Sequence, residues 1–279
     1  MSGTISGVSN PPGCRVVVLT DAGGVFVAST ISHATTGAFS FTSIPNGNYA
    51  VVFLDVQGTL RGRIAHTNVN VITPVTSVSH LPLSADLTDT RGLVWQAMNG
   101  AAVSGGKLVL SGANWIKTTG NVTAFDIGQG ERETAVEFCV EAFVTVSVRA
   151  EAPVFAKWGN GGTSYFFGFN EVGKPVMYYT RAINNLGQYI IGTAVAPLGS
   201  EFHVAFYSKG EYFYVAINGV PEPMGYSFGF LTTNQPNTIG AINGGGSYFK
   251  GAIRDVRVHN DKSIYGSTNF TPPSPPLGD

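Results

Sequence analysis

The sequence predicts an all-β protein built as a small sandwich followed by a larger one. Short runs of β-branched and aromatic residues recur roughly every ten residues over most of the chain. No long segment places apolar residues at the 3.6-residue spacing of an amphipathic helix. The run Phe202–Pro221 reads as two strands around a turn, and its second strand closes on Asn218-Gly219, a pair that suits a turn with positive φ.

The length of 279 residues suits two domains, and 43% hydrophobic and 11% aromatic residues are enough to build two cores. Charged residues make up only 12%, about half the usual share for a soluble domain. The surface must therefore be rich in Ser, Thr, Asn and Gly, which favours assembly or contact with sugars. The net charge is −1 and Lys and Arg form no run, so a nucleic acid partner is excluded. No apolar stretch is long enough for insertion into a membrane.

Residues 1–73 are predicted to form the small all-β unit. Val16–Leu19 is expected to be a buried strand, and Ala38–Thr42 alternates apolar and polar residues. Tyr49–Leu54 is apolar on both faces and is expected inside the sandwich. Residues 74–85 contain two prolines and several Ser and Thr residues, so they are predicted to be a linker.

Residues 86–279 are predicted to form the larger unit, a jelly-roll sandwich of short strands. The expected strands are Lys107–Leu110, two within Thr134–Val148, Val154–Trp158, Tyr165–Asn170, Pro175–Thr180, Tyr189–Thr193, two within Phe202–Ile217, Thr238–Gly240 and Lys250–His259.

Two resemblances refine this prediction. The order of Thr35–Phe41 and Ile44–Val51 resembles a transthyretin-like or carboxypeptidase-regulatory-like immunoglobulin sandwich, which implies a docking or spacer unit. A series of runs in the second unit resembles laminin G and concanavalin A-like domains, which implies a lectin-like module that binds carbohydrate or protein. These runs are Leu108–Gly112 with Trp115, Ala135–Val140, Val154–Gly159, Gly173–Tyr178, Phe202–Gly219 and Phe249–Asn260.

The end of the chain, Tyr265–Leu277, is similar to the ending of such domains in bacteriophage structural proteins. With no recognisable export signal at the N-terminus, the resemblance implies a virion protein of the tail or baseplate that is assembled in the host cytoplasm. The expected partners are other virion proteins, bound through residues 1–73, and a host surface polysaccharide. A homo-oligomer, guessed to be a trimer, is expected.

The sequence predicts a protein that is not an enzyme. A retaining glycosidase needs two carboxylates about 5 Å apart. Glu131 and Glu133 flank an arginine in a polar turn, and Glu137 and Glu141 are four residues apart, about 13 Å along a strand. No G-x-S-x-G motif is present.

No cofactor and no transition-metal site are expected, because the five histidines do not pair at ligand spacing and His203 is expected in the core. Calcium is left open, with Asp126, Asn260 and Asp261 near loops. Cys139 is expected to pack as a small hydrophobic residue rather than to form a disulfide.

The candidate glycan-binding residues are aromatic and amide side chains near Gly-rich loops. An aromatic face stacks on a pyranose ring, and an amide both donates to and accepts from hydroxyl groups. The candidates are Trp158, Asn160, Tyr165, Asn184, Tyr189, Asn243 and Tyr248. The alternative is that Trp158 and Tyr165 are core residues and that the Gly–Asn pairs are turns.

Two functions follow from these observations, and a third interpretation is an enzyme that depolymerises a glycan. The first is a phage receptor-binding protein whose lectin-like domain attaches to a host cell-surface glycan. The alternative is a structural decoration or spacer protein of the virion that binds no glycan.

Overall fold

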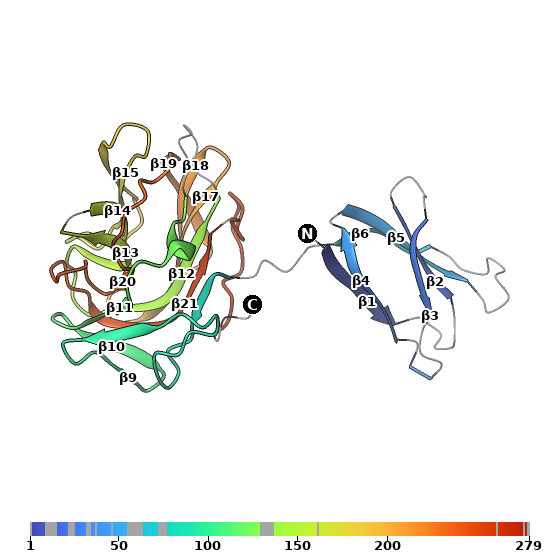
Figure 1. The fold of residues 1–279 in the computed structure, drawn as a ribbon, viewed down its shortest axis with the longest axis horizontal. Helices are drawn as coiled ribbons and strands as arrows, with labels where there is room; N and C mark the ends of the chain where they lie inside the picture. The colour runs from blue at the N-terminus through green and yellow to red at the C-terminus, as the bar shows by residue number, and fades with distance from the viewer. Residues whose placement is uncertain are drawn as a thin grey trace. The chain divides into compact units, whose positions relative to one another are not determined.

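The computed structural model describes residues 2–8, 16–21, 26–31, 35–36, 38–45, 47–54, 64–71, 77–128, 137–160, 162–260, 262–275 and 277. The chain divides into two compact units, Met1–Pro74 and Val75–Asp279 (Figure 1). Within the described ranges every regular element is a strand except the short 3-10 helix η1, Thr123–Phe125, so the all-β prediction is confirmed. None of the helical structure in these ranges is long and apolar enough to cross a membrane.

The first unit contains a two-stranded and a four-stranded antiparallel sheet. The pair is β1 (Ser2–Val8) with β4 (Ala38–Pro45), and the larger sheet runs β3 (Phe26–Ile31), β2 (Val16–Asp21), β5 (Gly47–Leu54), β6 (Ile64–Val71). Strand β5 pairs on both sides, as its apolar sequence predicts. On β4 the rings of Phe39 and Phe41 lie 6.0 Å apart, which places them on one face as expected. Strands β1 and β6 escaped prediction because their apolar residues are interrupted by Gly, Ser, Thr and Asn.

The second unit is a sandwich of two antiparallel sheets (Figure 1). The eight-stranded sheet runs β19 (Val220–Tyr226), β18 (Tyr212–Ile217), β17 (Glu201–Lys209), β12 (Cys139–Val146), β21 (Lys250–His259), β10 (Lys107–Ser111), β9 (Ala102–Ser104), with β7 (Ser79–Leu81) also paired to β21. The seven-stranded sheet runs β16 (Gly187–Ile191), β15 (Pro175–Thr180), β14 (Gly162–Phe169), β13 (Ala152–Gly159), β20 (Thr238–Ile239), β11 (Trp115–Thr118), β8 (Trp95–Met98).

Aromatic side chains fill the space between these sheets. The ring of Phe167 on β14 stacks against Phe138 at 5.5 Å and against Phe206 on β17 at 5.6 Å. Alternate residues of β17 enter this core, so the period-2 pattern of the Phe202–Ile217 run correctly predicts its buried face. The turn between β18 and β19 is Asn218-Gly219 with φ of 49° and 76°, as the dipeptide predicts.

In the second unit the predicted linker and one predicted pair of strands differ from the structure, and strands β8, β9, β11 and β19 were not predicted. Part of the predicted linker 74–85 belongs to the second unit: β7 pairs with β21, and Leu81 and Leu83 are buried. A three-residue strand is too short to show a periodic pattern, so proline content misled the prediction. In the segment Thr134–Val148 the structure describes one strand, β12, and residues 129–136 lie outside the described ranges.

Candidate functional site

A pocket of about 200 Å³ opens at one end of the seven-stranded sheet. It is formed by strand β11, the turn that follows β8 and the loop 243–248 that follows β20. The side chains that give it chemical character are Asn99, Trp115, Lys117, Asn243 and Tyr248. These residues come from segments far apart in the sequence.

The loop 243–248 has a fixed backbone. The Asn243 N–H donates to the Trp158 carbonyl at 2.7 Å, and the Gly245 N–H donates to the Ile242 carbonyl at 3.1 Å. Gly245 has a φ of 87°, and a Cβ at this position would lie 2.4 Å from the Tyr248 hydroxyl oxygen. The backbone conformation therefore favours glycine here, and a larger residue would also have to displace the Tyr248 hydroxyl group.

The side-chain amides of Asn99 and Asn243 each donate one hydrogen bond to the protein. Asn243 Nδ2 donates to Gln235 Oε1 at 2.8 Å, and Asn99 Nδ2 donates to the Ala113 carbonyl at 2.9 Å. Among the described residues, the side-chain oxygens of Asn99 and Asn243 have no hydrogen-bond partner, and the Tyr248 hydroxyl has none either. The pocket thus offers oriented acceptors and a hydroxyl group to a ligand.

Lys117 is the one charged residue among those lining the pocket. Its Nζ lies 5.8 Å from the centroid of the Trp115 ring, within the range of a cation–π contact. Both side chains lie on the same face of β11, while Ile116 and Thr118 between and beside them are fully buried.

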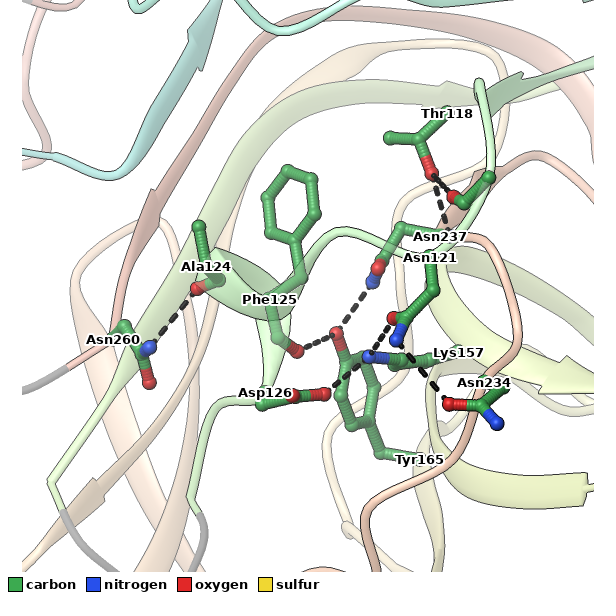
Figure 2. A network of polar contacts seen from close by, with 11 residues as sticks. Thr118, Asn121, Ala124, Phe125, Asp126, Lys157, Tyr165, Asn234, Asn237 and Asn260 are labelled. Carbon is green, nitrogen blue, oxygen red and sulfur yellow. Dashed lines mark hydrogen bonds and ion pairs between the residues drawn. The ribbon is translucent and has the colours of Figure 1, made fainter.

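A polar network joins the η1 segment to strands β13 and β14 and to the end of β11 (Figure 2). The Lys157 side chain is 0% exposed, and its Nζ pairs with the Asp126 carboxylate and donates to Asn121 Oδ1 at 2.9 Å. Asp126 follows helix η1 directly, so this ion pair fixes the η1 segment to β13.

The same network continues to the strand that carries Lys117. The Tyr165 hydroxyl donates to the Phe125 carbonyl at 2.9 Å and accepts from Asn237 Nδ2 at 2.5 Å (Figure 2). The Asn237 N–H donates to Thr118 Oγ1 at 3.0 Å, and Thr118 is the neighbour of Lys117 in β11. Burial raises the pKa of the Tyr165 hydroxyl well above its ordinary value, so Tyr165 stays neutral.

Tyr165 was predicted to contact a glycan, and the structure contradicts this. It is 0% exposed, and its ring stacks on Phe155 and Phe167 in the core between the sheets. The alternative interpretation, that Tyr165 is a core residue, is correct. The sequence could not decide between them, because an inward and an outward position on β14 differ by only one residue.

The other predicted residues fall into three places. Asn243 and Tyr248 line the pocket, and the carbonyl of the exposed Asn160 accepts from Gln235 Nε2 beside it. Asn184 is exposed in a separate turn, where its Oδ1 accepts from the Leu186 N–H. Lys117, Trp115 and Asn99 were missed.

Trp158 belongs to a cluster on the seven-stranded sheet that is separate from the main core, and Tyr189 contacts that cluster through Tyr178. Tyr178 lies between them, with ring centroids 5.9 Å from Trp158 and 4.0 Å from Tyr189. Trp158 is partly buried by these contacts, whereas Tyr189 is 42% exposed. The structure therefore does not bring Trp158 and Tyr189 into the pocket.

The carboxylate of Glu141 is held by three donors on the eight-stranded sheet. Its Oε2 accepts from His203 Nε2 at 2.8 Å and from the Tyr265 hydroxyl at 2.6 Å, and its Oε1 accepts from Arg257 Nε at 2.7 Å. Burial disfavours the charged carboxylate, but the His203 and Tyr265 hydrogen bonds and the Arg257 charge outweigh it, so the pKa of Glu141 is lowered. His203 is buried, as predicted.

Of the remaining polar candidates, Glu137 and Asn260 have partners within the protein. Glu137 pairs with Lys209 at 2.9 Å, and Glu131 and Glu133 lie outside the described residues. Asn260 Nδ2 donates to the Ala124 carbonyl at 2.9 Å, and Asp261 lies outside the described ranges. Where the structure describes the chain, no group of three or more His, Cys, Asp and Glu side chains is placed to hold a metal ion. Cys139 is a buried free thiol, and Cys14 is not among the described residues.

Residues 112–263 match the family described as the concanavalin A-like lectin/glucanases superfamily, and this match confirms the fold predicted for the second unit. No curated protein matches the chain. Among solved structures, a mutant Trypanosoma rangeli sialidase with trans-sialidase activity is 15% identical, with 71% of this chain and 32% of that chain covered and a TM-score of 0.49. The present chain therefore spans about a third of the sialidase.

Two further solved structures resemble this chain to a similar degree. Domain 4 of an extracellular arabinanase from Geobacillus stearothermophilus, solved with arabinotriose, is 17% identical over 67% of this chain and 93% of that chain, with a TM-score of 0.42. The receptor binding domain of botulinum neurotoxin type G is 10% identical over 67% of this chain and 48% of that chain, with a TM-score of 0.48.

The prediction that the chain is not an enzyme is wrong, because the matched family does not exclude an enzymatic activity. The family that residues 112–263 match includes both lectins and glucanases. The prediction relied on carboxylate spacing along one sequence. Such spacing does not decide between binding and hydrolysis in a fold that supports both.

Proposed function

Because the chain belongs to the concanavalin A-like lectin/glucanases superfamily, we propose that its second unit binds a glycan on a host cell surface and thereby attaches a bacteriophage virion. The pocket at loop 243–248 is the proposed glycan site. The observation that carries the proposal is that Tyr248, Asn243 and Lys117 line one preformed pocket.

The chemistry of the pocket supports a sugar ligand. The phenol ring of Tyr248 offers an apolar face and a hydroxyl group to a pyranose ring. The oxygens of Asn99 and Asn243 accept hydrogen bonds from sugar hydroxyls. Because both amides and the loop backbone are already hydrogen-bonded, little conformational entropy is lost when a ligand binds.

The virion role is supported by the resemblance of Tyr265–Leu277 to phage structural proteins. In this proposal the immunoglobulin-like first unit docks to other virion or baseplate proteins. A homotrimer then presents several weak glycan sites together, which raises the avidity for a cell surface through the effective concentration.

We expect Tyr248→Ala to reduce binding to bacterial surface polysaccharides by about tenfold or more, since a stacked aromatic residue at the centre of a site contributes about 2 kcal/mol. The full-length chain is applied to an array of these polysaccharides, and Tyr226→Ala is the matched control. Tyr226 is 62% exposed on β19, in the other sheet. Equal loss in both variants, or no loss in Tyr248→Ala, would contradict the assigned site.

The same array separates the other functions. A chain that retains no polysaccharide but still enters virions would be the structural spacer. Release of reducing sugar from a bound polysaccharide would place the chain with the glucanases of its superfamily.

A further inference from the structure

We propose that the pocket selects glycans that carry a carboxylate, and that Lys117 is the residue that recognises this group. The inference rests on the proposed glycan-binding function and names the class of sugar. It follows from the charge at the pocket and from the hydrogen-bonding capacity of its side chains.

The charge of the pocket is unbalanced. The eight lining residues include Lys117 and no Asp or Glu. In the part of the chain that the structure describes, no carboxylate lies within ion-pair distance of Lys117. Five other cations, Lys107, Lys157, Lys209, Arg254 and Arg257, each pair with a carboxylate, whereas Lys174 and Lys250 in the described ranges, like Lys117, pair with none.

The other polar groups of the pocket are neutral, so Lys117 alone can supply a positive charge to a ligand. Asn99 and Asn243 each use one of their two side-chain N–H groups within the protein, which leaves an oxygen and one N–H on each amide. These neutral groups suit sugar hydroxyls but carry no charge to balance a carboxylate. The Lys117 ammonium supplies three donors and a positive charge, which together suit a carboxylate.

The position of Lys117 is fixed in a way that favours recognition. Its Nζ lies 5.8 Å from the centroid of the Trp115 ring, and its neighbour Thr118 is fully buried and accepts from the Asn237 N–H. These contacts hold the strand that carries the ammonium at the pocket. A cation that is placed before the ligand arrives loses little side-chain entropy on binding.

The test uses hyaluronate, polygalacturonate and polysialate, each also in a form whose carboxylates are reduced to alcohols, with neutral dextran beside them. Binding of the full-length chain to each immobilised polymer is measured by biolayer interferometry. We expect at least one carboxylated polymer to bind and its reduced form to bind about tenfold or more weakly, the range for loss of a charge-assisted hydrogen bond. Binding should also weaken as salt is raised.

The variants assign this preference to Lys117. Lys117→Gln should lose the preference for the carboxylated polymer, and Lys117→Arg should keep most of it, because a guanidinium also donates to carboxylates. Lys174→Gln is the control: it removes the same charge at the turn that joins β14 to β15, at the opposite end of β14 from the pocket. All three variants should unfold at the urea concentration of the unsubstituted chain.

Three outcomes overturn the inference. If the reduced polymer or dextran binds as tightly as the carboxylated one, and Tyr248→Ala still abolishes binding, acid selectivity is wrong and the glycan site stands. If Lys117→Gln and Lys174→Gln lose affinity equally, the effect is one of net charge and Lys117 is not the recognition residue. If no polymer is retained, or binding ignores Tyr248→Ala, the proposed glycan site fails together with the inference.

Discussion

Glu141→Gln is expected to destabilise the second unit by about 3–5 kcal/mol, the cost of removing one partner from a buried ion pair. Glu141 is 1% exposed and neutralises Arg257, and it also accepts from His203 and Tyr265. The amide that replaces it carries no charge and turns two N–H donors toward groups that are themselves donors. Urea unfolding followed by tryptophan fluorescence measures the loss, since Trp95, Trp115 and Trp158 all lie in the second unit.

Glu137→Gln is the matched control for this substitution. Glu137 pairs with Lys209, but both side chains are substantially exposed, at 30% and 43%. An exposed pair contributes about 0–1 kcal/mol. Equal effects of the two substitutions would show that Glu141 is not held in a buried ion pair.

The Glu141 effect should depend on pH in a defined direction. The pKa of Glu141 is lowered in the folded chain relative to the ordinary value of 4.5. A carboxylate of this kind contributes its full stability above pH 4.5, and the contribution is lost as the pH falls through the lower folded-state pKa. The difference in stability between the unsubstituted chain and Glu141→Gln should therefore be largest near neutral pH and shrink below pH 4.5.

Asp126→Ala is expected to cost a similar amount, about 3–5 kcal/mol, because it leaves the fully buried Lys157 ammonium without its counter-ion. Lys157→Met should cost much less. The remaining Asp126 carboxylate is 12% exposed and can be reached by water, and a methionine of similar length fills the space of the lysine stem.

The double variant, Asp126→Ala with Lys157→Met, completes this test. With both charges removed, most of the stability lost in Asp126→Ala should return, which identifies an unpaired buried charge as the cause. The measurement is again urea unfolding by tryptophan fluorescence. An Asp126→Ala variant within about 0.5 kcal/mol of the unsubstituted chain, the range of ordinary surface substitutions, would contradict the network in Figure 2.

Much of the fold could be predicted because its longer strands carry strong local patterns. In Phe202–Ile217 the alternation of buried residues and the Asn218-Gly219 turn agree with each other, so strands β17 and β18 and the turn that follows them could be predicted from the sequence. Strands of three or four residues, such as β7 and β8, are fixed by pairing with neighbours distant in the chain. No local pattern of that length can reveal such pairing.

The candidate site could be predicted only in part, for a related reason. Asn243 and Tyr248 flank a Gly-rich run, which is a visible signal. Trp115 and Lys117 are spaced two apart, so they share a face once Trp115–Thr118 is known to be a strand, but nothing local places that strand beside loop 243–248. Tyr165 shows the opposite error, since an aromatic residue after a Gly-rich loop looks like a binding residue until its burial is known.

Hydrogen–deuterium exchange of the full-length chain, with and without a polysaccharide that it retains, tests the central claim most directly. The claim is that a preformed pocket beside β11 holds the sugar. The account predicts new protection in loop 243–248, in the turn at Asn99 and at the end of β11, with little change elsewhere in the second unit. Protection centred instead on the stacked Tyr178 and Tyr189, with the pocket unchanged, would contradict it.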